Sequence, residues 1–282
     1  MHSHCACRTD AHFFFFWGVA PGDGPVKCAR TASAMNLHVA TYNIHKGLSA
    51  FNRRMMLREL RERLRLLEPD IVFLQEVQGL HERHAIRFED WPEEPQYEFL
   101  ADSVWPDFAY GRNSVYDHGH HGNAILSRFP IDSAENLDVS SHPFESRGLL
   151  HCRIELPKGR PKVHCLCVHL ALGDRGRMRQ VGAIIERVME VVPADEPLIV
   201  AGDFNDWRNR AGRRLVAELG LREAFRDVRG RPARSFPSRL PLLRLDRIYV
   251  RGFSIQHAEV HHGDTWGRIS DHAMLTARLG FE

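Results

Sequence analysis

Residues 198–205, LIVAGDFN, decide the fold class of this chain. The four apolar residues at the start form a short continuous run that is typical of a buried strand. The run ends at Gly202, after which Asp203 and Asn205 bring polar groups to the end of the strand. Polar residues in this position are typical of a catalytic cleft at the edge of a sheet. The partners of Asp203 are therefore expected at the ends of other strands.

Strand-like and helix-like segments mix on both sides of this stretch. Apolar runs and alternations predict further strands at residues 37–43, 71–74, 108–116, 123–128, 148–156, 163–170, 245–250, 253–260 and 273–279. Leucines at three- and four-residue spacing predict an amphipathic helix over residues 52–67, which Pro69 ends, and a second helix is expected over residues 177–192. No composition break or fixed repeat interrupts residues 35–282, so we expect one α/β domain with largely antiparallel strands.

The composition is that of an ordinary globular protein. Of the 282 residues, 43% are hydrophobic and 26% are charged, which argues against a disordered or fibrous chain. The net charge of +2 argues against a histone-like protein and leaves room for a local basic site. Only four of the 38 basic residues are lysines, which leaves 34 arginines. This excess suits phosphate binding, but a GC-rich genome would also produce it.

The six cysteines fall into two groups, residues 5, 7 and 28 and residues 152, 165 and 167. Neither group has the spacing of a disulfide framework, so a reduced cytoplasmic setting is expected. Cys165, Cys167 and His169 alternate along one strand and superficially resemble a soft-metal site. No further cysteine at metal-ligand spacing accompanies them, so the thiols are better explained as small buried hydrophobic groups.

The first 34 residues differ in character from the rest. They contain a phenylalanine run at residues 13–16 and a proline- and glycine-rich stretch at residues 21–25. The run is too short to span a bilayer, and the basic region and cleavage site of a secretory signal are missing, so no transmembrane segment is expected. Because Met35 directly precedes the first clear strand, we expect residues 1–34 to be a disordered leader or a mis-assigned upstream extension.

Eight polar residues stand at the predicted strand ends. They are Asn43, Glu76, His169, Asp203, Asn205, Asp246, Asp271 and His272. Taken singly, each has an ordinary explanation as a turn cap or a solvated strand end. Together they offer mostly carboxylate and amide oxygens, which suit Mg²⁺ or Mn²⁺ better than Zn²⁺. A cation held in this way keeps open positions for a phosphate, so the set predicts phosphoester chemistry.

Three longer segments carry a family resemblance. They are YNIHKG at residues 42–47, GNAILSR at residues 122–128 and GDFNDW at residues 202–207. In these segments, and in the order of the other polar strand-end residues along the sequence, the chain resembles the endonuclease/exonuclease/phosphatase superfamily. The resemblance runs from about residue 35 to residue 279. The resemblance implies a four-layered α/β sandwich, with two central, mostly antiparallel sheets flanked by helices and a cleft at one edge. It also implies divalent-metal-dependent hydrolysis of phosphoric esters.

The resemblance implies a metal site and a histidine–aspartate pair. Asn43, Glu76 and Asp271 would hold Mg²⁺ or Mn²⁺. His272, oriented by Asp246, would act as general base on the attacking water or as its electrostatic partner. Such a task suits a side chain that titrates near neutral pH.

The remaining assignments concern the phosphate. Asp203 and Asn205 would position the nucleophile and the scissile phosphate, and His169 would donate to a nonbridging oxygen or assist the leaving group. Asn123 and Arg208 are predicted to bind substrate. Apurinic endonucleases of the superfamily typically lack a histidine matching His169, so an abasic-site repair enzyme is disfavoured.

The substrate stays open between several classes. We expect nucleic acid first, and a phospholipid head group or a small phosphate ester second; a non-catalytic phosphate-binding module is the rival from another class. An exposed apolar rim would favour a lipid, whereas an arginine track would favour nucleic acid. Candidate substrate contacts are the histidines at residues 118, 120 and 121 and the arginine-rich stretch 226–244 with Phe236, although exposed loops without such a role would have the same composition. The chain is expected to act as a monomer.

Overall fold

The computed structural model describes residues 35–282 with the exception of residues 50–52, 103, 143–144 and 158. The side chain of Leu80 is also excepted. The predicted leader, residues 1–34, lies outside the described residues. From Met35 to Glu282 the described chain belongs to one compact unit.

Two six-stranded sheets form the centre of this unit. The first runs in the order β11 (Phe253–His261), β12 (Met274–Phe281), β1 (Asn36–Asn43), β2 (Ile71–His81), β4 (Gly119–Ser127) and β3 (Asp107–Tyr116). The second runs in the order β5 (Ile131–Asp138), β6 (Gly148–Ile154), β7 (Val163–His169), β8 (Leu198–Asp203), β10 (Asp246–Arg251) and β9 (Arg222–Glu223). Neighbouring strands are antiparallel apart from β1–β2 and β7–β8.

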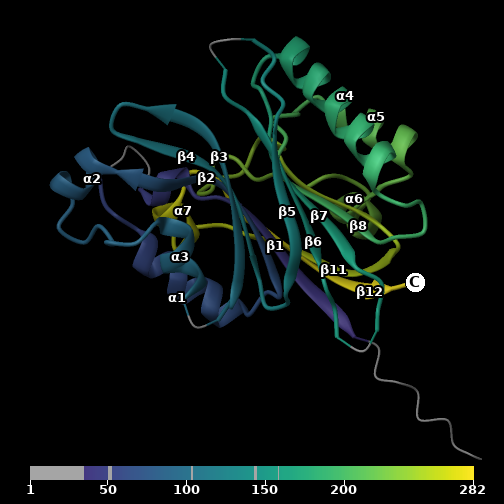
Figure 1. The fold of residues 1–282 in the computed structure, drawn as a ribbon, viewed down its shortest axis with the longest axis horizontal. Helices are drawn as coiled ribbons and strands as arrows, with labels where there is room; N and C mark the ends of the chain where they lie inside the picture. Colours follow the sequence, from purple (N-terminus) through teal and green to yellow (C-terminus); the bar gives the residue numbers. More distant parts are fainter. Residues whose placement is uncertain (1–34, 50–52, 103, 143–144, 158) are drawn as a thin grey trace, which may run out of the picture. The chain divides into compact units, whose positions relative to one another are not determined.

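Helices cover the outer face of each sheet, which makes four layers (Figure 1). The described helices are η1 (His45–Gly47), α1 (Leu57–Leu67), α2 (Glu82–Arg87), α3 (Gln96–Ala101), α4 (Asp174–Val191), α5 (Arg210–Leu219), α6 (Ala224–Arg229) and α7 (Trp266–Ile269). Helices α1 and α3 pack on the first sheet, and α4 and α5 pack on the second. Among these helices, none is long and apolar enough to cross a membrane. The four-layered α/β sandwich predicted from the sequence is confirmed.

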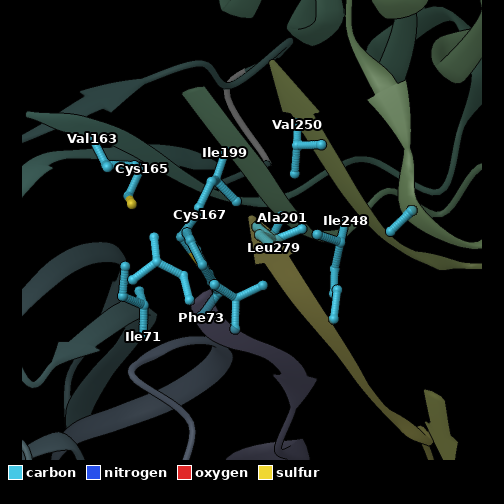
Figure 2. Packing of buried hydrophobic residues seen from close by; sticks show 14 of the residues in the cluster. Ile71, Phe73, Val163, Cys165, Cys167, Ile199, Ala201, Ile248, Val250 and Leu279 are labelled. Atoms are coloured by element: carbon cyan, nitrogen blue, oxygen red, sulfur yellow. The ribbon is translucent and has the colours of Figure 1, made fainter. Parts of the chain in front are cut away.

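The main core lies between the sheets. Phe73 of β2 and Leu279 of β12 face Cys165 of β7 and Ile199 of β8, and all four side chains are buried (Figure 2). On β8 the alternate residues, such as Val200, point instead into the layer under α4 and α5. A strand covered on both faces is apolar at every position, which explains the unbroken run before Gly202.

Sequence patterns located most elements but missed some. The helix expected over residues 52–67 begins only at Leu57, and residues 50–52 are outside the description. Strand β5 and helices α2 and α3 were not predicted. Apolar periodicity cannot detect β5, because most of its side chains are exposed at the edge of the second sheet.

Gly202 lets β8 approach β7 closely at the entrance to the site. Its φ of +147° lies in a region that side chains with a Cβ rarely adopt, and a Cβ there would stand 2.0 Å from the carbonyl oxygen of Val168. Gly173, at the start of α4, has an ordinary φ of −74°, and a Cβ there would meet no atom within 4 Å. The two glycines therefore make a matched pair.

We predict that Gly202→Ala lowers the free energy of unfolding by at least ~2 kcal/mol, because the backbones of β7 and β8 must separate. Gly173→Ala should change it by less than ~0.5 kcal/mol. Urea unfolding monitored by circular dichroism measures both values. Equal midpoints for the two variants would show that the strands tolerate the added Cβ.

A chain of polar groups runs beneath the outer face of the second sheet, away from the cleft. His151 of β6 shares a 2.9 Å hydrogen bond with His164 of β7, and His164 lies 2.6 Å from a carboxylate oxygen of Glu196. Burial, followed by the nearby charge of His164, lowers the pKa of His151 to about 4. The folded protein therefore favours the neutral form of His151.

This shift predicts acid sensitivity. Between pH 6.5 and pH 4 the unfolded state binds a proton at His151 that the folded state does not, so stability falls as the pH falls through this window. A single group with this shift accounts for up to ~3 kcal/mol. Urea unfolding at several pH values gives the free energy of unfolding as a function of pH. Between pH 4 and pH 6.5 this free energy should depend less steeply on pH for His151→Leu than for the unchanged protein. Identical slopes would mean that the His151 ring is not buried in its neutral form.

Candidate active site

The two parallel strand pairs deliver the predicted site. Strands β1 and β2 end their pairing near Asn43 and Glu76, and β7 and β8 end with His169 paired to Asp203. These four side chains line one cavity of about 410 Å³ at the edge of the sandwich. Parallel strands bring their carboxyl ends to the same edge, so each sheet contributes a pair of polar groups to a common space.

Glu76 owes its position to an irregularity in β2. Its φ is +57°, and the register of β2 against β4 shifts between Leu74 and Val77. A bulge of this kind redirects a side chain that regular alternation would place elsewhere. Asn43 then donates its amide group to Glu76 Oε1 at 3.4 Å and to Asp203 Oδ2 at 3.2 Å. One amide therefore bridges carboxylates from the two sheets.

Asp203 is the centre of the hydrogen-bonding arrangement. Its Oδ1 accepts from the backbone N–H of Asn205 at 2.9 Å. Its Oδ2 lies 3.6 Å from His169 Nε2 and 3.8 Å from His272 Nε2. Asn205 has a left-handed backbone, with φ of +49°, and donates its side-chain amide to Leu170 O at 2.9 Å. Buried Asp203 thus accepts from two amide N–H groups and lies close to two imidazole rings that could exchange a proton with it.

His272 is held from behind by Asp246. The distance from His272 Nδ1 to Asp246 Oδ2 is 2.9 Å, which leaves Nε2 facing the cavity and Asp203. Ser270 donates to Asn43 O at 2.7 Å, and the ring of Phe236 packs 5.1 Å from the His272 ring. The C-terminal segment before β12 is thereby fastened to the end of β1.

Burial and neighbouring charges perturb these groups. Burial and the charge of Asp246 raise the pKa of Asp203 to about 6. Burial alone would lower the pKa of His272, but the carboxylates of Asp246 and Asp203 outweigh it and raise that pKa. Burial, with Arg147 next in importance, lowers the pKa of His169 well below its usual range. Strongly perturbed groups that share one cavity are typical of a catalytic centre.

Two sets of residues could hold a cation. Asp203, Asp246 and His272 offer ligand atoms within 4.8 Å of one another. A metal there would compete with the 2.9 Å hydrogen bond between Asp246 and His272, so we favour the pair of Glu76 and Asn43, which line the cavity beside Asp203. These oxygen-rich groups fit a hard cation such as Mg²⁺ or Mn²⁺.

Four of the predicted residues are absent from this cavity lining: Asp246, which lies behind His272, and the three residues described next. Asp271 is 3.3 Å from His45 Nδ1 and accepts from Ser270 at 3.4 Å. Asn123 is buried and donates to the carbonyl oxygens of Gly148 and Cys167, which joins β4 to the second sheet. Arg208 is exposed and is not among the cavity residues. Their predicted roles, in metal binding for Asp271 and in substrate binding for the other two, stay predictions.

Several other residues line the cavity although they are outside the predicted set of site residues. Lys46 lies in the family segment YNIHKG and His121 is one of the candidate substrate contacts, but Arg147 comes from a stretch without any pattern. An apolar rim joins them: Leu172, Trp207 and Leu243 line the cavity with 65%, 41% and 42% of their surface exposed. Phe236 lines it as well, whereas none of the six arginines between residues 226 and 244 does.

Comparison with known proteins settles the family. The model of the endonuclease/exonuclease/phosphatase family matches residues 40–272, a range that includes every predicted site residue. The chain belongs to this family. The resemblance expected from the sequence is confirmed.

Relatives in the family include the "uncharacterized protein YbhP" of Escherichia coli K12, which is 52% identical over 241 residues, covering 86% of this chain and 95% of that protein. A solved endonuclease/exonuclease/phosphatase from Beutenbergia cavernae superposes with a TM-score of 0.68 at 19% identity, over 87% of this chain and 72% of the other. A mannosyl-6-phosphatase from Bacteroides thetaiotaomicron gives 0.65 at 17% identity, over 87% and 100%. At these identities the solved structures show a shared fold alone.

Proposed function

We propose that the chain is a divalent-metal-dependent phosphodiesterase. The observation that carries the proposal is the Asn43 amide, which bridges Glu76 and Asp203 in a cavity that His272 also faces. Other family members hydrolyse phosphoric esters, and the carboxylate, amide and imidazole groups at the strand ends of this chain suit that reaction. The buried free thiols of Cys152, Cys165 and Cys167 support a reduced, cytoplasmic location.

Glu76 and Asn43 would hold Mg²⁺ or Mn²⁺. Asp271 would bind the cation directly or through a water molecule. Asn43 would have to turn its amide so that the oxygen faces the cation, which releases its donation to the two carboxylates. When bound, the cation supplies positive charge to a phosphoryl oxygen.

The protein side chains then divide the remaining work. Asp246 fixes the ring of His272, so that Nε2 exchanges a proton with the attacking water or, while protonated, stabilises charge on the phosphate. Asp203 and Asn205 orient the water and the scissile phosphate. His169, 3.6 Å from Asp203, lies near enough to contact a nonbridging oxygen or the leaving group. Lys46 and Arg147 add positive charge to the same cavity.

Two substrate classes follow from the walls of the cavity. Nucleic acid is the first class, because Trp207 and Phe236 could stack on a base while Lys46 and Arg147 contact phosphates. The exposed leucines favour a second class, phospholipids. Leu240 and Leu242, 69% and 58% exposed, lie in the same loop as the rim residue Leu243.

Removing the metal ligand and the histidine should separate their roles. Glu76→Ala and His272→Ala should each lower kcat/KM for bis(p-nitrophenyl) phosphate by roughly 10³-fold, because each loses charge stabilisation in the transition state. Calorimetric titration with Mn²⁺ should show lost binding for Glu76→Ala and retained binding for His272→Ala.

Glu190→Ala and His257→Ala, on exposed positions of α4 and β11, serve as matched controls and should retain activity. Full activity in either site variant would refute the assigned role. Metal binding by the unchanged protein without turnover of any diester would instead support the non-catalytic phosphate-binding module.

A charge on the apolar rim should distinguish the substrate classes. If lipids are the substrate, Leu242→Asp should lower the ratio of activity on phospholipid vesicles to activity on bis(p-nitrophenyl) phosphate by about tenfold, because a carboxylate opposes contact with an apolar surface. Met189→Asp, on exposed α4, should leave the ratio unchanged. An unchanged ratio for Leu242→Asp would leave nucleic acid as the favoured class.

A further inference from the structure

A second, smaller cavity adjoins the catalytic one. Its volume is about 240 Å³. It is lined by Lys46, Gln78, His81, His84, Arg87, Tyr116 and His121. Lys46 and His121 also line the catalytic cavity, so the two spaces share a wall. A group bound in the smaller cavity would therefore sit beside a phosphate held at Glu76 and Asp203.

The smaller cavity is lined by cations and no anions. Among its described lining residues there is no carboxylate, while Lys46 and Arg87 carry permanent charge and three histidines face the same space. Burial, followed by the neighbouring charges of His81, Arg87 and Lys46, lowers the pKa of His84 to about 4. The protonated ring lacks a compensating negative charge.

The histidines are held in fixed orientations. The rings of His81 and His84 stack with centroids 3.6 Å apart and planes 7° apart. His81 Nδ1 accepts from the backbone N–H of His84 at 3.1 Å, so a neutral His81 carries its proton on Nε2. His84 Nδ1 lies 3.1 Å from Gln78 Oε1, which requires Nδ1 to be the donor. His81 therefore has an Nε2–H group that can donate, whereas Nε2 of His84 donates only when that ring is protonated, as a bound anion would favour.

Aromatic packing keeps this arrangement rigid. Trp91 packs against both stacked rings, at 6.2 Å from His81 and 5.2 Å from His84. Gln78 of β2 also donates to the hydroxyl of Tyr116 at 3.3 Å, which joins β2 to β3. A metal ion is not the expected ligand, because the Nδ1 atoms of His81 and His84 already form hydrogen bonds. The one group of described residues placed to share a metal ion does not include either histidine.

We propose that this cavity is a subsite for a second phosphate group of the substrate, next to the phosphate that is hydrolysed. The inference rests on the proposed phosphodiesterase function and narrows its substrate class to esters that carry two phosphates. Lys46, shared by both cavities, would lie between the two anions and interact with each. Arg87 and the two stacked histidines would contact the second phosphate alone.

Paired substrates test the subsite. The first pair is a dinucleotide with and without a terminal 5′-phosphate, and the second is phosphatidylinositol with and without a phosphate on its ring, presented in vesicles. The unchanged protein should prefer the phosphorylated member of one pair by about tenfold in kcat/KM, the value of one charge-assisted contact. The pair that shows the preference identifies whether the second phosphate comes from a nucleotide or a lipid head group.

Variants on one helix provide the control. Arg87→Gln and His84→Gln should each bring the ratio within a pair close to one. Arg83→Gln removes an exposed charge from the same helix α2 at a position outside the cavity lining, and it should keep the ratio. No preference in either pair, or a preference that Arg87→Gln leaves intact, would overturn the proposal.

Failure of the proposed function is measured separately, by turnover of bis(p-nitrophenyl) phosphate, which has no second phosphate. If that substrate is not hydrolysed, binding decides the fate of the subsite. Inorganic phosphate added to the metal-free protein should then raise the pKa of His84, measured by NMR titration of its ring protons. Arg87→Gln should reduce this increase. A His84 titration that phosphate does not move would overturn the subsite.

Discussion

The contact between the Asn43 amide and the carboxylates of Glu76 and Asp203 is the constraint on which the site depends. Glu76 belongs to the first sheet and Asp203 to the second, and a single side chain reaches both. Two carboxylates this close repel each other unless positive or donor groups lie between them. Packing of the sheets face to face therefore determines the electrostatics of the cleft as well as the stability of the fold.

The chemical character of the cleft changes from one wall to the next. Carboxylates and amides occupy the strand ends, leucines and aromatic rings form one rim, and histidines with arginine and lysine form the adjoining cavity. Under the proposed function, a substrate that satisfies all three walls would have a phosphate at the centre, with an apolar portion on one side and a further negative charge on the other. This combination is more selective than the family fold, which serves many reactions.

Much of this arrangement followed from the sequence, because buried strands produce apolar runs and the runs end in the polar residues of the site. The stretch LIVAGDFN located β8 and Asp203 in this way. The position of Glu76 depended on a bulge, and that of Arg147 on a loop, and neither leaves a periodic signal. Asn123 lies inside a family segment, and its side-chain amide donates to two backbone carbonyl oxygens, a contact for which the sequence contains no pattern. The smaller cavity joins residues from β2, α2 and β3–β4, which only the folded chain brings together.

The thiols in the layer between the sheets have a further consequence for the lifetime of the protein. Cys152, Cys165 and Cys167 are buried there, and burial raises their pKa values, so they stay protonated and unreactive towards oxidants. Cys167 also donates to Leu74 O across the layer at 3.4 Å. A molecule whose sheets separate would expose all three sulfurs at once and become open to irreversible oxidation. The rate at which these cysteines are oxidised therefore depends on how often the core opens, and folded molecules are protected.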